Sequence, residues 1–235
     1  MSVLSAITAP FHVAFGIGNP FDWCLCPKPV ARCEYSHTYD SGVPTVAIIP
    51  LKSFRAGKQR LADAITAEQR ATLGMALALH VAEVAVAADL LPLFVTADPE
   101  VATWSATSGF PVLPESSEGL NGAARTGVDW AEQSGSRWVV IHSDLPLLEV
   151  DDLTSLLSRG DHVIAPSSDG GTSAISSEGP LDFEFGPLSF HRHLSRMTSP
   201  IVVTRTGFLL DVDSPNDLKA ALERSDDGWL AASLR

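Results

Sequence analysis

The stretch at residues 45–62 reads TVAIIPLKSFRAGKQRLA, a β-branched apolar run that ends in a basic loop. The loop carries four cations within nine positions, Lys52, Arg55, Lys58 and Arg60. Ligands of open α/β sheets bind beyond the carboxyl ends of the strands, and clustered cations at that place suit a polyanion such as a nucleoside triphosphate. The stretch therefore predicts phosphate binding, with a solvated helix face as the alternative.

The apolar pattern beyond this stretch alternates short runs with longer helical ones, which is typical of βα units stacked around a mainly parallel sheet. The predicted strands span residues 45–50, 92–96, 111–113, 137–142, 162–165, 173–176, 201–204 and 208–212. The predicted helices span residues 67–88, 99–108, 121–133, 150–158, 187–196 and 215–223. We expect one Rossmann-like α/β domain over residues 44–235, with a mainly parallel central sheet flanked by helices.

The composition limits the class of partner. The chain has 235 residues, 45% of them hydrophobic, which is enough for one large domain with a well-buried core. A net charge of −12 argues against nucleic acid and anionic membranes, because either would need a broad positive surface. The chain lacks an uninterrupted apolar run of about 18 residues and a secretory signal, so we expect a cytoplasmic protein.

The first 43 residues predict an irregular leader, rich in proline and glycine. Three cysteines and a histidine follow the pattern C-x-C-x6-C-x3-H, at Cys24, Cys26, Cys33 and His37. This spacing lacks the C-x2-C pair of common zinc sites, so zinc binding stays only an alternative. We interpret the leader as a poorly ordered extension, or as the result of a start codon assigned too far upstream.

Acidic residues lie at the ends of two predicted strands. Asp144 ends the apolar run WVVIHSD just before Pro146, and Mg²⁺ needs only one or two carboxylates when phosphates and water complete its shell. Asp211 and Asp213 alternate at another predicted strand end and could share a metal with Asp144. The alternatives are helix capping, by Asp144 in one segment and by Asp213 or Ser214 in the other. We interpret His142 as a packing residue.

Two glycine-containing segments complete the candidate site. In the loop SSDGGTS at residues 167–173, Gly170 and Gly171 permit a tight turn whose N–H groups can face an anion, and Thr172 adds a hydroxyl; an ordinary hairpin loop is the alternative. In FEFGPLSFHRH at residues 183–193, Gly186 precedes a predicted helix start. Ser189 would then lie at a helix N-terminus, which attracts phosphate and carboxylate groups.

Six segments taken together resemble the guanylyltransferase family of coenzyme F420 biosynthesis, which joins a small phosphorylated acid to GMP. They are PLKSFRAGKQRLA, GLNGAA, SDLPLL, DGGTSAI, FGPLSFHRH and DVDSPNDL, in this order over roughly residues 44–223. The resemblance implies a compact nucleotidyltransferase fold, similar to that of the molybdenum cofactor guanylyltransferases, together with GTP as substrate and Mg²⁺ as cofactor. The first loop lacks the glycine-rich signature of the molybdenum cofactor enzymes.

The resemblance also implies a role for each matched residue. Asp144 and Asp211 would be metal ligands, and Thr172, Gly186 and Ser189 would contact the phosphorylated three-carbon acid. The catalytic cations Lys52, Lys58 and Arg60 would surround the GTP phosphates, while Leu120 and Asn121 would hold the guanine or ribose.

Bacterial relatives of this family commonly use phosphoenolpyruvate, which we therefore expect as the acceptor. 2-Phospho-L-lactate and 3-phosphoglycerate remain open, as does a homodimer. The alternative functions are another small-molecule nucleotidyltransferase, such as a molybdenum cofactor guanylyltransferase, and a nucleotide-binding domain without catalysis.

Overall fold

Strand β1 (Thr45–Pro50) lies in the interior of a seven-stranded sheet, because its β-branched and apolar residues can be buried on both faces. The computed structural model describes residues 43–115, 119–179, 181–225 and 228–235, so residues 1–42 of the predicted leader, with its cysteines, lie outside the described residues. The other strands are β2 (Leu91–Thr96), β3 (Val112–Pro114), β4 (Arg137–Ile141), β5 (Val163–Pro166), β6 (Thr172–Ser176) and β7 (Ile201–Val202).

The strand order is β3-β2-β1-β4-β6-β5-β7. Strand β1 pairs in parallel with β2 and β4, β2 with β3, and β5 with β7. Strand β6 runs antiparallel to both of its neighbours, β4 and β5. The prediction of a single α/β domain with a mainly parallel sheet is confirmed.

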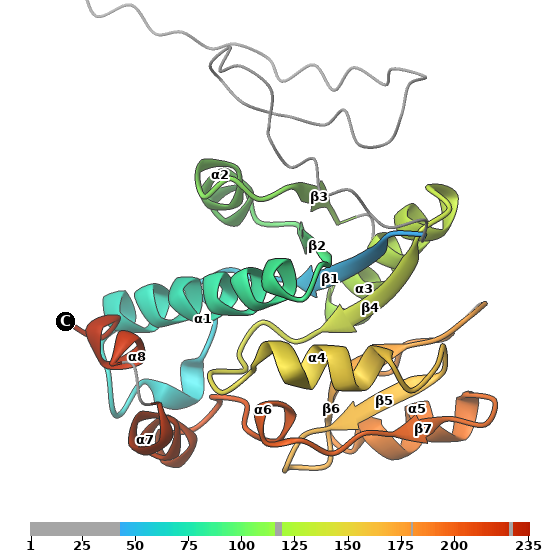
Figure 1. Ribbon diagram of the computed structural model, residues 1–235. Coiled ribbons are helices and arrows are strands. Elements are labelled where there is room, and N and C mark those ends of the chain that lie inside the picture. The colour runs from blue at the N-terminus through green and yellow to red at the C-terminus, as the bar shows by residue number, and fades with distance from the viewer. Residues whose placement is uncertain (1–42, 116–118, 180, 226–227) are drawn as a thin grey trace, which may run out of the picture.

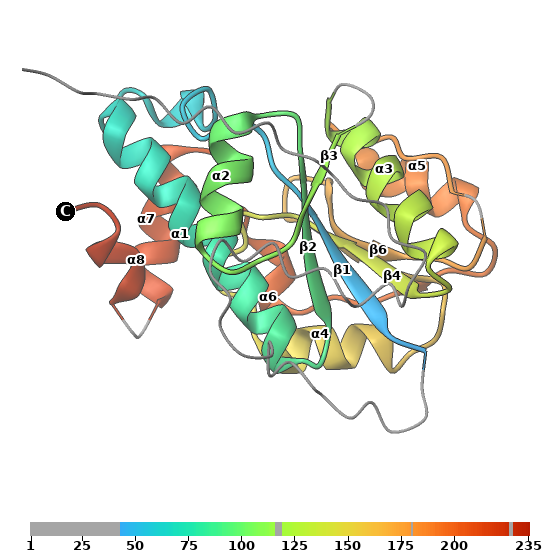
Figure 2. The same ribbon diagram turned by 90° about the horizontal axis from the view of Figure 1, so that it is seen from above.

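Helices cover both faces of this sheet, as Figures 1 and 2 show. Helices α1 and α4 lie against one face, and α3 and α5 against the other. The helices are α1 (Ala67–Ala87), α2 (Pro99–Thr107), α3 (Gly119–Gln133), α4 (Val150–Leu157), α5 (Ser189–Arg196), α6 (Thr206–Leu209), α7 (Pro215–Arg224) and α8 (Trp229–Ala232), with a 3-10 turn η1 (Gln59–Leu61). Thr66, Asp98 and Ser214 cap α1, α2 and α7 through side-chain hydrogen bonds to backbone N–H groups.

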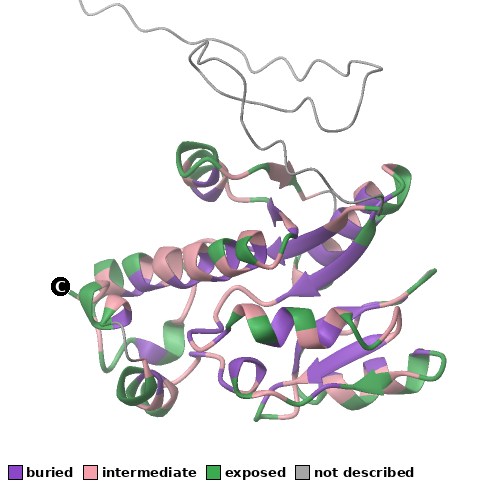
Figure 3. Ribbon diagram, in the orientation of Figure 1, coloured by how far each residue is buried: buried purple, intermediate pink, exposed green. Residues whose placement is uncertain are grey.

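The core forms two layers because side chains alternate along each strand. In β1, Ala47 and Ile49 face α1 and α4, whereas Val46 and Ile48 face α3. Figure 3 shows this burial concentrated on the strands and on the inner helix faces. A third cluster joins Leu61 to Val212, α7 and α8. This third cluster connects the end of the basic loop to the C-terminal part of the chain.

One predicted strand is wrong. Residues 208–212 were expected to be a strand, but they contain the end of the short helix α6 and an extended segment outside the sheet. The apolar alternation is satisfied by burial alone, since Phe208 and Val212 lie fully within the core. Backbone partners come from loops, because the Val212 N–H donates to the Asp144 carbonyl and the Ser168 N–H donates to that of Leu209.

Other differences concern element ends and two short helices. Strand β7 is shorter than predicted, and η1 and α8 were not predicted. Helix α5 begins at Ser189 instead of residue 187, because Leu188 takes a left-handed conformation with φ 58° that interrupts the helix. The helices α1, α2, α3, α4 and α7 match the prediction within one or two residues, whereas α6 was not predicted.

Helix α1 is the only helix of the described residues that is long and apolar enough to cross a membrane, by length and composition alone. Leu77, Val81 and Ala85 lie fully buried on the face that packs against the domain. A buried face of this kind is typical of a core helix.

The packing of α3 on β1 predicts a measurable loss of stability for Gly127→Ala. A Cβ atom at Gly127 would lie 2.4 Å from Ile48 Cγ2 and 3.1 Å from Val95 Cγ2. We expect unfolding in urea to show a destabilisation of about 1–3 kcal/mol, because overpacking outweighs the gain in helix propensity. Gly74→Ala in α1 is the matched control, since its Cβ would meet only the Phe54 side chain, at 3.1 Å. Equal effects of the two substitutions would contradict the packing argument.

Candidate active site

The candidate site lies at one edge of the sheet. Because β1, β4 and β5 are parallel members of the sheet, their carboxyl ends meet there, and antiparallel β6 starts there with Thr172. The basic loop follows β1, Asp144 follows β4, and the loop of residues 167–171 joins β5 to β6. The topology therefore gathers several of the predicted site residues at the same edge (Figure 1).

Lys58 joins the basic loop to the two acidic segments. Its Nζ donates to Asp144 Oδ2 at 3.2 Å and to the Val212 carbonyl at 2.7 Å. Val212 stands between Asp211 and Asp213 in the sequence. It is buried in the third core cluster together with Leu61, and this packing holds the end of the basic loop against the segment of residues 211–213. Lys58 itself has a left-handed backbone, with φ 51°, which turns the chain at the start of η1.

Asp144 does not cap the following helix, because Glu149 is the N-cap of α4. Burial alone would raise the pKa of the Asp144 carboxyl. The charge of Lys58 and its hydrogen bond outweigh burial and hold this pKa below its usual value. Asp144 is therefore ionised at neutral pH.

Asp211 has the opposite behaviour. Burial, followed by repulsion from Asp144, Asp169 and Asp213, raises the pKa of Asp211 to about 7. Ser214 caps α7, which answers the capping alternative for this segment in favour of Ser214 and leaves both aspartates outside that role. The negative charge of these neighbouring carboxylates would favour the binding of a cation.

The available ligands suit Mg²⁺, which completes its shell with phosphates and water, better than a metal that is held by protein ligands alone. Among the described residues, no group of three or more His, Cys, Asp or Glu side chains could hold a metal by itself. Two nearby carboxylates, Asp144 and Asp211, provide the oxygen ligands that Mg²⁺ prefers, and phosphates and water usually complete its shell. His142 lies beside them with its Nε2 buried, and burial lowers the pKa of this imidazole.

The remaining cations of the basic loop point outward. Lys52 and Arg60 are exposed, and Arg60 Nη1 lies 3.8 Å from Asp213 Oδ2. Arg55 is paired with Glu100 at 2.7 Å, away from the acidic segments. The alternative of a solvated face thus describes part of the loop, whereas Lys58 turns inward.

The predicted acceptor residues form a hydrogen-bonded group. Ser189 Oγ lies 3.2 Å from Thr172 Oγ1, and both side chains are buried. Gly186, with φ 131°, precedes α5, and its carbonyl accepts from the Ser189 N–H. The structure therefore brings Thr172, Gly186 and Ser189 together from β6 and the start of α5.

The loop of residues 167–171 is a hairpin loop, as the alternative interpretation held. The N–H of Gly170 donates to the Ser167 carbonyl and that of Gly171 to Asp169 Oδ1, so both are used within the loop. A hydrogen bond from Ser167 is the largest of the effects that hold the pKa of Asp169 below its usual value. The expectation that these two N–H groups are free to face a bound anion is wrong, because both donate to acceptors of the loop itself.

Leu120 and Asn121 lie in the first turn of α3, apart from the Lys58 contact. Asn121 Oδ1 accepts from the Phe185 N–H at 2.7 Å and so ties α3 to the segment that precedes Gly186. The nucleotide-binding role of Leu120 and Asn121 stays a prediction.

His193 is a further functional candidate, to which the sequence assigned a place near the predicted helix N-terminus but no role. Its Nδ1 lies 2.9 Å from Thr172 Oγ1, and its Nε2 accepts from the Glu184 N–H at 2.8 Å. The spacing of Ser189 and His193, four residues apart on one helix face, is the only local signal for their proximity. Thr172 comes from a different element, so its contact with His193 depends on tertiary structure.

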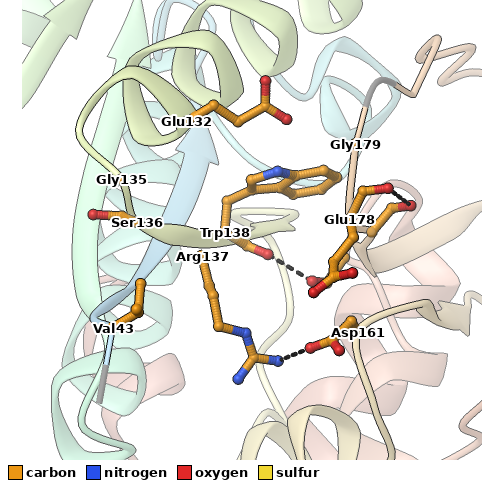
Figure 4. A pocket seen from close by; sticks show the side chains of 11 residues that line it. Val43, Glu132, Gly135, Ser136, Arg137, Trp138, Asp161, Glu178 and Gly179 are labelled. Atoms are coloured by element: carbon orange, nitrogen blue, oxygen red, sulfur yellow. Dashed lines mark hydrogen bonds and ion pairs between the residues drawn. The ribbon is translucent and has the colours of Figure 1, made fainter. Parts of the chain in front are cut away.

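A hollow of about 350 Å³ lies at the opposite edge of the sheet, where β4 begins (Figure 4). Arg137 points toward Asp161 there, at 2.7 Å, and Ser176 Oγ donates to the Trp138 carbonyl. The cationic side chain that lines the hollow, Arg137, is thus already paired with the Asp161 carboxylate. This hollow is therefore separate from the site around Lys58.

The buried imidazole of His193 predicts acid sensitivity. Burial, followed by the charges of Arg192, His142 and Arg196, lowers the pKa of His193 from 6.5 to about 4. The unfolded chain therefore binds the proton more tightly, so this contribution to stability is complete above pH 6.5 and is lost as the pH falls from 6.5 to 4. The loss amounts to on the order of 3 kcal/mol.

Urea unfolding between pH 7.5 and 4 measures this loss. His193→Asn is the control, because it removes the titrating group while the carboxylates elsewhere remain. The difference in free energy of unfolding between wild type and His193→Asn should shrink as the pH falls. A difference that stays constant with pH would contradict the prediction.

Comparison with known proteins identifies the family. The model of the family "Guanylyl transferase CofC like" matches residues 45–227, most of the chain. A 2-phospho-L-lactate guanylyltransferase from Methanothermobacter thermautotrophicus is 32% identical over 183 residues, covering 74% of this chain and 82% of the relative. A phosphoenolpyruvate guanylyltransferase from Sphaerobacter thermophilus is 31% identical over 188 residues, covering 74% and 91%.

Among solved structures, a putative nucleotide-diphospho-sugar transferase from Desulfovibrio desulfuricans G20 is similar in fold. The TM-score is 0.61 at 15% identity, covering 80% of this chain and 94% of the other. The family match and the two sequence relatives extend over nearly the whole of the described domain. The chain belongs to the CofC-like guanylyl transferase family.

Proposed function

We propose that the protein joins GMP, taken from GTP, to phosphoenolpyruvate and releases pyrophosphate, as a step of coenzyme F420 biosynthesis. The observation that carries this proposal is the contact of Lys58 with both Asp144 and the segment of residues 211–213. A cationic loop and two carboxylates at one sheet edge are the parts that phosphoryl transfer needs. The acceptor is taken from the names of relatives such as the Sphaerobacter enzyme.

The reaction needs no protein nucleophile. An oxygen of the phosphoenolpyruvate phosphate forms a bond to the α-phosphorus of GTP, and the bond from that phosphorus to the oxygen that bridges to the β-phosphate breaks. Pyrophosphate leaves with the electron pair, and the product is enolpyruvoyl-diphospho-5'-guanosine. Because the attacking oxygen already carries negative charge, catalysis rests on positioning and on neutralisation of charge.

The residues of the chain divide this work. Lys58, with Lys52 and Arg60 nearby in the same loop, neutralises the triphosphate and the departing pyrophosphate. Asp144 and Asp211 would hold Mg²⁺, which supplies positive charge beside the triphosphate when it is bound. Thr172, Gly186 and Ser189 orient the acceptor, while Leu120 and Asn121 hold the guanosine. We place this enzyme in the cytoplasm.

Mass spectrometry of the products tests the proposal. The protein is incubated with GTP and Mg²⁺ and, separately, with phosphoenolpyruvate, 2-phospho-L-lactate or 3-phosphoglycerate. We expect the guanylylated product and equimolar pyrophosphate with phosphoenolpyruvate, and neither with CTP in place of GTP. A preference for 2-phospho-L-lactate would change the proposed acceptor and leave the proposed guanylyl transfer unchanged. Binding of GTP without pyrophosphate release from any acid would overturn the proposal in favour of a non-catalytic domain.

A further inference from the structure

His193 lies at the centre of a buried hydrogen-bond chain that links three separate segments. Its exposed fraction is 0%, and those of Thr172 and Ser189 are 1% each. The ring accepts from the Glu184 N–H through Nε2 and lies 2.9 Å from Thr172 Oγ1 through Nδ1. Phe185 packs edge-on against it, with ring centroids 4.8 Å apart. The imidazole therefore has one fixed orientation.

The backbone N–H of Glu184 determines the tautomer. An N–H group can only donate, so Nε2 of His193 must be unprotonated. A neutral imidazole then carries its single hydrogen on Nδ1, and this hydrogen is donated to Thr172 Oγ1. His193 is thus a donor toward the hydroxyl pair.

A count of the hydrogens then shows that the Thr172–Ser189 pair has one hydrogen left to donate. Three hydrogens are present, on His193 Nδ1 and on the two hydroxyls, but only two hydrogen bonds join these groups. Whichever way the Thr172–Ser189 bond runs, one hydroxyl hydrogen remains. Within the part of the chain that the structure describes, no side chain or carbonyl accepts it. A buried donor without an acceptor is costly unless a ligand or water supplies the missing oxygen.

We propose that His193 is a positioning residue for the acceptor, which makes the Thr172–Ser189 pair a hydrogen-bond donor to an anionic oxygen of the phosphorylated acid. This inference rests on the proposed function, in which these two hydroxyls contact the acceptor. The pair lies between the glycine turns at Gly170 and Gly186, because the Phe190 and Ser189 N–H groups donate to their carbonyls. An imidazole hydrogen on Nε2 instead would let the pair turn its oxygen lone pairs toward the acceptor and repel it.

Two substitutions separate the halves of the imidazole. In His193→Asn the amide nitrogen can take the place of Nδ1 and still donate to Thr172, whereas His193→Gln reaches the place of Nε2 and leaves Thr172 without its donor. Each variant loses one hydrogen bond, so we expect similar decreases in Tm. We expect His193→Gln to raise the KM for phosphoenolpyruvate by about tenfold to a hundredfold, since hydrogen bonds to charged groups are worth that factor. His193→Asn should stay within about threefold, and neither variant should move the KM for GTP more than about twofold.

Three results would overturn the inference. The first is a folded His193→Gln protein with an unchanged KM for phosphoenolpyruvate, and the second is an equal rise of this KM in both variants. The third is a ¹⁵N NMR spectrum of wild type that places the ring hydrogen on Nε2.

Failure of the proposed function has a different signature. In that case wild type itself releases no pyrophosphate with any of the three acids. Calorimetric binding of phosphoenolpyruvate then decides about His193 independently of turnover. The inference stands only if His193→Gln weakens that binding and His193→Asn does not, and it fails if wild type binds no phosphoenolpyruvate.

Discussion

Asp144→Asn should lower kcat about a thousandfold or more while the protein stays folded. The substitution keeps the size of the side chain and one acceptor oxygen, but it removes the negative charge that a divalent cation needs. Loss of a single group that stabilises developing charge costs about 10²–10³ in rate, and we expect the loss of a metal ligand to cost at least that much. Pyrophosphate release at saturating GTP and phosphoenolpyruvate measures the effect.

Stability distinguishes this loss from unfolding. Lys58 keeps its hydrogen bond to the Val212 carbonyl in the variant, so Tm should fall by only about 5 °C. Asp89→Asn is the control, because it makes the same change of charge at an exposed position. Asp89 has φ 58°, which asparagine tolerates, and it precedes the amino end of β2, opposite to the candidate site. Asp89→Asn should turn over at the wild-type rate. Substantial activity of Asp144→Asn would contradict the metal-ligand role.

Lys58→Gln should lower kcat/KM for GTP by about a hundredfold to a thousandfold. The side chain of Lys58 is only 12% exposed, and its ammonium is the one cation of the basic loop that lies against Asp144. A fixed positive charge in such a place stabilises charge on the phosphates without reorganisation of solvent. Glutamine keeps most of the length of the side chain and removes the charge, so initial rates as a function of GTP concentration report the electrostatic contribution.

Lys219→Gln provides the comparison for Lys58. Lys219 lies on α7, 76% exposed, 3.9 Å from Glu223, so its loss should leave kcat/KM within about twofold of wild type. In Lys58→Gln, the KM for phosphoenolpyruvate should change less than the KM for GTP, because the residues proposed to bind the acceptor come from β6 and the start of α5. An unchanged kcat/KM for GTP in a folded Lys58→Gln protein would remove Lys58 from the catalytic residues.

The fold was readable from the sequence because its signals are local. The apolar run of β1, the capping candidate Ser214, and the alternation of short and long apolar segments each depend on neighbours within a few positions. The same reasoning was wrong for residues 208–212, where alternating burial arises without sheet pairing. A strand pattern reports burial, and only the tertiary structure decides which backbone groups pair.

The candidate site shows the same division. The basic loop, the acidic residue after β4 and the hydroxyls near Gly186 could be named from residue type and from a resemblance to a family. The sequence alone did not distinguish Lys58, which turns inward, from Arg55 and Arg60, which face solvent. That difference depends on partners 86 and 154 positions away along the chain, Asp144 and Val212.

The sequence by itself determined the α/β class, most of the strands and helices along the chain, the chemical types available at one sheet edge and the family. The tertiary structure alone decided which charges meet, which carboxyl has its pKa raised, and which nitrogen of His193 carries the hydrogen. The physical reason is that propensity and periodicity act between near neighbours, whereas burial, Coulomb interaction and hydrogen bonding depend on distances in space.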